Sequence, residues 1–566
     1  MLTFATDGRG KSRLSLLRHR HEVVSGMTSS VTQELLGFHY THENTSAADI
    51  LNYASSNVSS WTDIHALAAR PSSPSYPGRG RLVLLSDSAG HPRYRRTTVR
   101  GLIGWAPHWT LLCIPADGSE DTSGKSGSTP PPEDLLGAAA ADMDLSQGHM
   151  NLCLNLGLPF IVVITKLDLA SRAGLRATLA KVFSSLKSAG RNPQVLYDKP
   201  TNAPTDFGSV SLLDFEEAGN LVTKLEESSY NIVPIILTSS VKGSGINRLL
   251  ALLAALPVPK VSPSFPVTIQ DTVMSTNSEE ELGTLFHIED VYSNRAHHDN
   301  APMVVLSGLL RHGQISIGDQ LYLGPHATDT VEDDHLNIPK PPFKRNAAAP
   351  RSYPGALPKT GILDKAVAFE SQEEWQTVRV KSLRNLRRPV RTLFADQVGT
   401  VGVTPCTTSS ALSARSLATL RVRKGMVLAL RKPSGIRTIT VQLSRPDVPK
   451  INLGSDVVVY VGSVRAGAKV IGLPTTFTPA SVSQAGGQDP DDGFGFDFEG
   501  DEAEVEAPLT PTLMTLEFIS SSREFVAVGS QALLMPGGPG LYGGERGEKG
   551  VAGLEGYAGV VVRANG

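Results

Sequence analysis

The chain has 566 residues, 40% of them hydrophobic and 19% charged, which is enough for roughly three or four domains with separate cores. Its formal net charge of −2 argues against a protein that binds nucleic acid through a large overall basic excess, but it is compatible with a local basic face. Three widely spaced cysteines favour a reducing compartment, and without an apolar N-terminal segment or a membrane-length apolar run we expect a soluble, cytoplasmic protein with no membrane contact.

An α/β domain is predicted over residues 1–258, because apolar runs alternate with stretches of helical apolar spacing. Strands are expected at Leu82–Leu85, Trp109–Pro115, Pro159–Ile164 and Ile232–Leu237. Helices are expected at Ser46–Tyr53, Thr97–Ala106, Leu135–Leu156, Ala170–Ser188, Leu212–Glu226 and Asn247–Leu256. Short buried strands joined by helices form mostly parallel, doubly wound sheets, which bind ligands at the carboxyl ends of the strands.

The pattern changes to short segments of period 2 from Phe265 onward, with glycines between them. This pattern predicts two all-β barrel domains, at residues 265–433 and 436–566. Three polar, acidic or Pro-rich stretches, at 117–133, 325–370 and 488–507, are expected to be surface insertions.

Two stretches of the α/β domain carry residues suited to phosphate and magnesium. Asp87-Ser88-Ala89-Gly90-His91 follows the first predicted strand, and an acid followed by a glycine at a strand end is how α/β folds build such a site. An ordinary strand-to-helix turn is the alternative. Upstream, Thr28 in the loop Ser25–Val31 offers a hydroxyl to Mg²⁺ and a backbone N–H to a phosphate, although Ser/Thr loops are common.

A third stretch, Thr165-Lys166-Leu167-Asp168, ends a buried strand. A lysine stem can pack on a purine face, and the Asp168 carboxylate can accept two hydrogen bonds from guanine N1 and N2, each worth roughly 1.5–3 kcal/mol. The turn Ser239–Gly243, after the next strand, can donate backbone N–H groups to guanine O6. A strand-end loop with a solvated Lys and Asp is the alternative.

Basic residues gather in the first predicted barrel, and they have two interpretations. They are Arg379, Lys381, Arg384, Arg387, Arg388 and Arg391, and then Arg421, Arg423, Lys424, Arg431 and Lys432. Such residues are either the solvated face of barrel strands or a salt-sensitive contact surface for RNA.

The order and spacing of these motifs, followed by two barrels, resemble the elongation factor Tu class of translational GTPases. The segments D-S-A-G-H-P-R-Y-R-R-T-T-V-R-G-L, T-K-L-D and Y-V-G-S-V-R-A-G-A-K-V-I-G look like its GTP-binding protein 1/2 branch. The resemblance implies a GTPase that uses GTP and Mg²⁺, acts on aminoacyl-tRNA and the ribosome or in ribosome-linked mRNA quality control, and works as a monomer.

The resemblance also assigns roles to residues. Thr28 would ligate Mg²⁺ directly and Asp87 would hold it through water. The Gly90 N–H would bind the γ-phosphate, and His91 would position the attacking water as the catalytic residue. Guanine would be recognised by Lys166 and Asp168 with Ser239 and Ser240, while Thr165 stands where the class usually has Asn.

One departure concerns the phosphate loop, which the class carries before Asp7-Gly8-Arg9-Gly10. Ala5–Ser12 fits a permissive phosphate-loop pattern, but only Met1–Phe4 precede it, so no buried strand aims the loop. Without that loop's roughly four charge-assisted hydrogen bonds, worth about 6–12 kcal/mol in total, we expect poor GTP binding. The sequence therefore leaves two hypotheses: an active GTPase whose first strand and loop lie outside the sequence, and a nucleotide-binding-defective relic that binds ribosomes or RNA.

Overall fold

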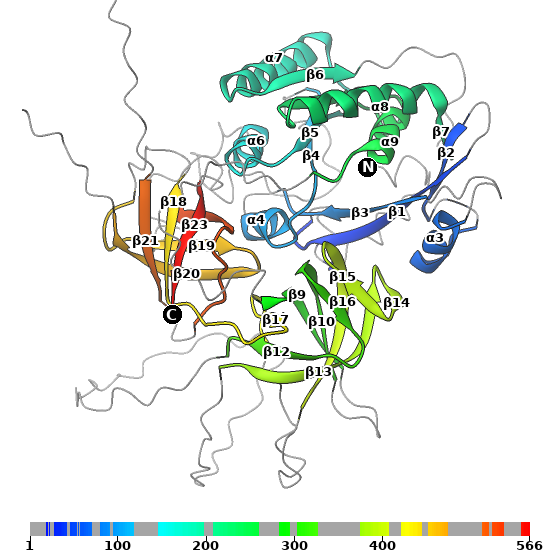
Figure 1. The fold of residues 1–566 in the computed structure, drawn as a ribbon. Helices are drawn as coiled ribbons and strands as arrows, with labels where there is room; N and C mark the ends of the chain where they lie inside the picture. The colour runs from blue at the N-terminus through cyan, green and yellow to red at the C-terminus, as the bar shows by residue number, and fades with distance from the viewer. Residues whose placement is uncertain are drawn as a thin grey trace, which may run out of the picture.

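The computed structural model describes sixteen stretches of the chain and three single residues (Figure 1). These are residues 19–20, 22, 28–41, 46–53, 55, 57–70, 80–90, 94–117, 145–196, 208–259, 282–294, 303–326, 374–406, 420, 422–443, 451–473, 512–519, 523–536 and 556–566. His91 and the segments Ser25–Met27 and 1–18 lie outside the described residues. No helix in these ranges is long and apolar enough to cross a membrane.

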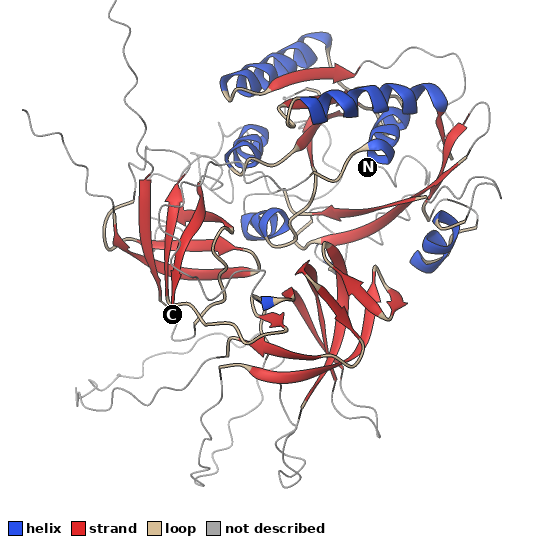
Figure 2. Ribbon diagram, in the orientation of Figure 1, coloured by secondary structure: helices blue, strands red, loops and turns tan. Residues whose placement is uncertain are grey.

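The N-terminal part contains two four-stranded sheets and helices around them (Figure 2). The first sheet is antiparallel, in the order β3 (Arg81–Asp87), β1 (Thr32–Tyr40), β2 (Ser46–Leu51), β7 (Ser209–Ser211). The second is parallel, in the order β4 (Thr110–Pro115), β5 (Phe160–Thr165), β8 (Ile232–Leu237), β6 (Asn192–Leu196). The helices are α3 (Trp61–Ala68), α4 (Arg95–Ile103), α6 (Leu145–Asn155), α7 (Arg172–Ser188), α8 (Leu212–Glu227) and α9 (Ile246–Ala255).

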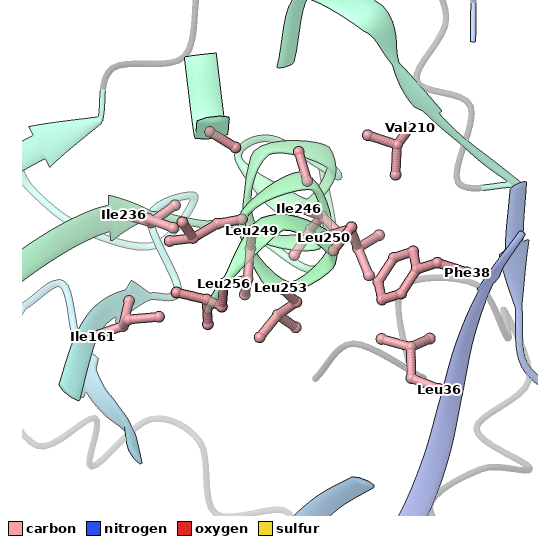
Figure 3. Packing of buried hydrophobic residues seen from close by; sticks show 14 of the residues in the cluster. Leu36, Phe38, Ile161, Val210, Ile236, Ile246, Leu249, Leu250, Leu253 and Leu256 are labelled. Carbon is pink, nitrogen blue, oxygen red and sulfur yellow. The ribbon is translucent and has the colours of Figure 1, made fainter. Parts of the chain in front are cut away.

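Helix α9 packs between the two sheets. Its sequence, I-N-R-L-L-A-L-L-A-A, is apolar on nearly every side, and almost all of it is buried, as expected for a helix enclosed by protein. Figure 3 shows Leu36 and Phe38 of β1 on one side of α9, and Ile161 of β5 and Ile236 of β8 on the other. The core of this part is therefore built across the helix rather than across one continuous sheet.

The described edges of β3 and β4 do not pair with each other. A cavity of about 3230 Å³ lies between them, lined among others by Val83 and Leu85 of β3 and by Leu111 and Cys113 of β4. Both strands are apolar, yet β3 is only half-buried and Cys113 is exposed. The α/β fold class is confirmed, but the expected single sheet is divided at this point.

Two β-barrels follow (Figure 1). The first consists of β9 (Leu285–Asn294), β10 (Met303–His312), β12 (Gln320–Gly324), β13 (Gln376–Asn385), β14 (Arg388–Val390), β16 (Gln397–Pro405) and β17 (Val427–Ala429), with the small pair β11 (Gln314–Ser316) and β15 (Thr392–Phe394) beside them. The second is closed by β18 (Thr438–Leu443), β19 (Asp456–Val461), β20 (Val464–Gly472), β21 (Thr512–Phe518), β22 (Gln531–Pro536) and β23 (Tyr557–Asn565). Their period-2 sequences place alternate apolar residues in separate cores.

The barrels contact the α/β part through α4 and α3. Val99 and Ile103 of α4 pack with Tyr460 and Leu533 of the second barrel. The Arg387 guanidinium of the first barrel lies 4.0 Å from the centroid of the Trp61 ring in α3, a cation–π arrangement. The second barrel therefore contacts α4, and the first barrel contacts α3.

One element was predicted wrongly. Residues 46–53 were expected to form a helix, but Ser46–Leu51 is strand β2, paired with β1 so that Ala48 lies opposite Tyr40. Residues 260–281, between the α/β part and the first barrel, lie outside the described residues, and the domain boundaries at 258, 265, 433 and 436 stay predictions.

Candidate functional site

The loops after β5 and β8 are bonded to each other at the carboxyl end of the parallel sheet. The Thr238 backbone N–H donates to the Ile164 carbonyl at 2.7 Å, and the Leu167 N–H donates to the Thr238 carbonyl at 3.2 Å. Lys166 adopts a positive φ of 57°, which turns the chain sharply and leaves its side chain exposed. Sheet pairing therefore places the two motifs predicted to bind guanine side by side.

Asp168 and Ser239 form the centre of this corner. The Ser239 hydroxyl donates to Oδ1 of Asp168 at 2.5 Å, while the Lys242 N–H donates to the same hydroxyl oxygen at 3.1 Å. The hydrogen bond from Ser239 is the main reason that the pKa of Asp168 lies below its ordinary value. Ser239 is fully buried and Ser240 is exposed, so Ser239 orients the carboxylate and Ser240 faces solvent.

The turn after β8 depends on glycine. Gly245 has a φ of 72°, and a Cβ there would lie 2.0 Å from the Leu237 carbonyl oxygen, so only glycine fits. The turn brings the Ser244 carbonyl back to accept the Ser239 N–H at 3.0 Å. The S-S-V-K-G-S-G sequence therefore fixes Ser239 before α9 begins.

Two further residues complete the corner. The Thr165 hydroxyl donates to the Ile114 carbonyl of β4 at 3.3 Å, so it ties β5 to its neighbouring strand. Sequence reasoning did not single out Asp117, whose Oδ2 accepts from the hydroxyl of Ser171 at 3.0 Å; Ser171 is the N-cap of α7. The signal available for Asp117 was its position just after a buried strand.

The second group of predicted residues lies at the end of β3. The Thr28 hydroxyl donates to Oδ2 of Asp87 at 3.3 Å. Although Asp87 reaches solvent, desolvation by the surrounding protein raises its pKa, and the hydrogen bond from Thr28 partly offsets this rise. A Cβ added to Gly90 would meet no atom within 4 Å, so the backbone there borders open space.

These two groups occupy different places in the fold. Asp87 and Gly90 line the cavity between β3 and β4, whereas Thr165, Lys166, Asp168 and Ser239 are not among its lining residues. Within the described ranges, no cluster of three or more His, Cys, Asp or Glu side chains is arranged to hold a metal. The oxygen donors of Thr28 and Asp87 fit Mg²⁺, which takes oxygen ligands and keeps several waters.

Several known proteins are similar to this chain in sequence or in fold. Residues 64–258 match the family model described as elongation factor Tu GTP binding domain. The chain is 27% identical over 324 residues to human GTP-binding protein 2, covering 56% of this chain and 41% of that protein. It is 29% identical to GTP-binding protein 1 of Xenopus laevis over 322 residues, covering 56% and 38%. The solved GTP-bound GTPase-like domain of S. cerevisiae Ski7 is 12% identical, with a TM-score of 0.48 and coverage of 97% of this chain and 86% of that chain.

The fold and the family match point to one class: residues 64–258 are similar to the GTP-binding domain of elongation factor Tu, and two β-barrels follow, as in the translational GTPase fold. Within that class its curated relatives are GTP-binding proteins 1 and 2, so the resemblance drawn from the motifs is confirmed. The chain spans about two fifths of the length of these relatives.

Proposed function

We propose that this chain binds GTP with Mg²⁺ and hydrolyses it to GDP, acting like an elongation factor on tRNA and the ribosome or in ribosome-linked mRNA quality control. The observation that carries the proposal is the Asp168 carboxylate, which is ionised and oriented by the Ser239 hydroxyl at the carboxyl end of the parallel sheet. Such a carboxylate is complementary to the two adjacent donors on the guanine edge, N1–H and N2–H.

The corner formed by Lys166, Asp168 and Ser239, called the guanine corner below, would account for a preference for guanine nucleotides. Two charge-assisted hydrogen bonds from guanine to Asp168 would favour guanine by roughly 10²–10⁴ in affinity over a base without those donors. The exposed Lys166 stem is free to cover one face of the purine, and Ser240 lies at the turn that offers N–H groups to O6. Thr165 acts indirectly, because its hydroxyl holds the strand that bears Lys166.

At the other group, Thr28 and Asp87 would hold Mg²⁺, and the Gly90 N–H would bind the γ-phosphate. Bound Mg²⁺ supplies charge neutralisation on the phosphate oxygens. A nearby cation also favours the ionised form of Asp87, against the desolvation that raises its pKa. His91, which lies outside the described residues, is proposed to orient the attacking water as the catalytic residue.

The first barrel offers a surface for RNA. Arg379, Lys381 and Arg384 project outward from β13, and Arg388 and Arg391 are exposed close by. Exposed arginines and lysines in a row suit a phosphate backbone. Other members of the basic set have protein partners, since Arg387 stacks on Trp61 and Lys424 pairs with Asp290. We therefore propose the β13 side of the barrel as the contact for aminoacyl-tRNA or ribosomal RNA.

A second candidate is a GTPase relic that keeps the ribosome or RNA contact and binds nucleotide poorly. The open gap between the described edges of β3 and β4 favours it. The gap borders Asp87 and Gly90, so the described residues there leave a large space on the phosphate side of the site. The β13 surface is shared by both candidates.

Titration of the 566-residue chain with a fluorescent GTP analogue separates the two. The proposed function predicts GTP binding that falls at least about a hundredfold in Asp168→Ala, the lower end of the range for the loss of two hydrogen bonds. Asp319→Ala is the matched control, because Asp319 accepts a hydrogen bond from Ser316 in a barrel turn far from the guanine corner. Equal binding by both variants contradicts the proposal. Absence of binding by the wild type, with salt-sensitive ribosome co-sedimentation retained, supports the relic.

A further inference from the structure

A carboxylate that no motif singles out is buried beside the Thr28 loop. Glu22 has a relative exposure of 0%. Its Oε1 accepts from the backbone N–H and the hydroxyl of Ser29 at 2.7 and 2.6 Å, and from those of Ser30 at 3.0 and 3.1 Å. Its Oε2 accepts from the His19 N–H at 3.0 Å. The carboxylate thus collects the donors of two successive residues.

These bonds keep the Glu22 side chain ionised. Burial raises its pKa, but the hydrogen bonds from Ser29, His19 and Ser30 outweigh burial and hold the pKa at about 2. An ionised carboxylate only accepts hydrogen bonds, which suits a group surrounded by N–H and O–H donors. The Glu22 carboxylate is therefore negatively charged near neutral pH and accepts the hydrogen bonds of the loop in that form.

The same loop is held from the opposite side. The Thr97 hydroxyl of α4 donates to the Ser29 carbonyl at 3.0 Å, so the N–H of Ser29 is bonded to Glu22 and its carbonyl to α4. Just beyond, β1 pairs with β3 in a register that sets Thr32 opposite Asp87. Thr28 directly precedes Ser29, which is bonded on both sides, and the Thr28 hydroxyl donates a hydrogen bond to Asp87.

We propose that Glu22 is a positioning residue that fixes Ser29 and Ser30 so that the Thr28 hydroxyl faces Asp87, thereby setting the geometry of the Mg²⁺ site. This inference rests on the proposed function, in which Thr28 and Asp87 hold the metal. Glu22 does not face the metal itself. It acts through the backbone of the loop, with Thr97 as the opposing contact.

The chain supplies a matched control. At the start of α3, Oδ2 of Asp63 accepts from the N–H and hydroxyl of Ser59 at 2.9 and 2.7 Å and from those of Ser60 at 2.9 and 3.1 Å. This is the same Ser-Ser-carboxylate arrangement, placed in a helix cap away from Thr28. Glu22→Gln and Asp63→Asn therefore remove one charge from the same hydrogen-bond arrangement, at a fully buried position and at a partly exposed one.

The first measurement needs no nucleotide. Amide hydrogen exchange at Ser29 and Ser30 is expected to be about tenfold faster in Glu22→Gln, because the neutral amide oxygen that takes the place of Oε1 accepts their hydrogen bonds more weakly than the carboxylate, and the new NH2 group cannot accept from the His19 N–H. It is expected to be unchanged in Asp63→Asn. Unchanged exchange in Glu22→Gln overturns the inference, whatever the chain's nucleotide affinity.

The second measurement separates positioning from simple stabilisation of the loop. The Mg²⁺ concentration needed for half-maximal retention of a non-hydrolysable GTP analogue is expected to rise about tenfold in Glu22→Gln, as for the loss of one metal-facing hydrogen bond. In Thr28→Ala the added Glu22→Gln change is expected to have no further effect, since both act through one hydroxyl. Additive effects, or a normal Mg²⁺ requirement despite faster exchange, overturn the positioning role. A wild-type chain that never retains the analogue contradicts the proposed function instead, and the exchange result then decides the role of Glu22.

Discussion

Replacing Glu289 by glutamine tests how the α/β part is joined to the first barrel. Glu289 lies on β9 with a side-chain exposure of 1%, and its Oε2 is 2.7 Å from Nε of Arg100 in α4. Its Oε1 has no hydrogen-bond partner among the described residues and would lie 2.5 Å from a Cβ added to Gly104. The side chain is therefore enclosed by the end of α4, with only one of its two oxygens paired.

Burial raises the pKa of Glu289 from 4.5 to about 7, although Arg100 opposes the rise. Because the pKa is higher in the folded than in the unfolded chain, the stabilisation is complete below about pH 4.5 and is lost as the pH rises through 7. A difference of about 2.5 pKa units corresponds to about 3 kcal/mol. Glutamine does not titrate. The unfolding free energy of Glu289→Gln, relative to that of the wild type, should therefore rise by about 3 kcal/mol between pH 4.5 and pH 8.

Urea unfolding at steps between pH 4.5 and 8 measures this difference, taken from the transition that includes the first barrel. Glu517→Gln is the control, because Glu517 is 46% exposed in an ion pair with Arg437 of the second barrel and surface pairs contribute little. If Glu289→Gln instead loses stability relative to the wild type as the pH rises, the Arg100 pair outweighs burial and the reasoning is refuted.

Three further predictions concern the packing of the α/β part. Phe38→Ala removes a fully buried ring that packs on α9, so we expect a loss of about 3–5 kcal/mol of unfolding free energy in urea titrations; a loss below about 1 kcal/mol would show that α9 does not depend on it. Maleimide should modify Cys113 at least about tenfold faster than Cys153, because Cys113 is exposed and Cys153 is buried. Desolvation raises the pKa of both thiols, that of Cys153 to about 12, so access separates the rates; equal rates by peptide mapping would mean that the gap is closed. Arg387→Ala should lower the unfolding free energy by only about 0.5–2 kcal/mol, because Arg387 stacks on Trp61. The loss of this cover should expose the Trp61 ring and shift its fluorescence to the red; a blue shift would contradict the stacking.

The arrangement of the two loops after β5 and β8 was largely predictable from the sequence, because its parts are local. The run Phe160–Thr165 is apolar on both faces and is buried as predicted, and parallel pairing to β8 then brings Asp168 beside Ser239. The predicted helices α7 and α8 have nearly the expected bounds, since each begins at a serine N-cap. Helix N-caps and hydrophobic periodicity, which are local signals, therefore predict this part of the fold.

The remaining parts depend on pairing between distant segments. S-A-A-D-I-L is too short to show its period, and its pairing with β1 decided that it is a strand. Nothing local indicates that β3 pairs with β1 on one side while its other described edge borders a cavity. Glu22 escaped notice because its partners are seven and eight residues away and form no motif.

The most direct test of the central claim, that Asp168 recognises guanine, is a change of base preference. In Asp168→Asn, the side-chain amide would donate to a carbonyl at C2 of the base while its oxygen still accepts from N1–H, an arrangement that fits xanthine rather than guanine. Competition between GTP and xanthosine triphosphate for the fluorescent analogue measures this preference. We predict that the wild type prefers GTP and that Asp168→Asn prefers xanthosine triphosphate by at least about tenfold. An unchanged preference for GTP in the variant would contradict the account.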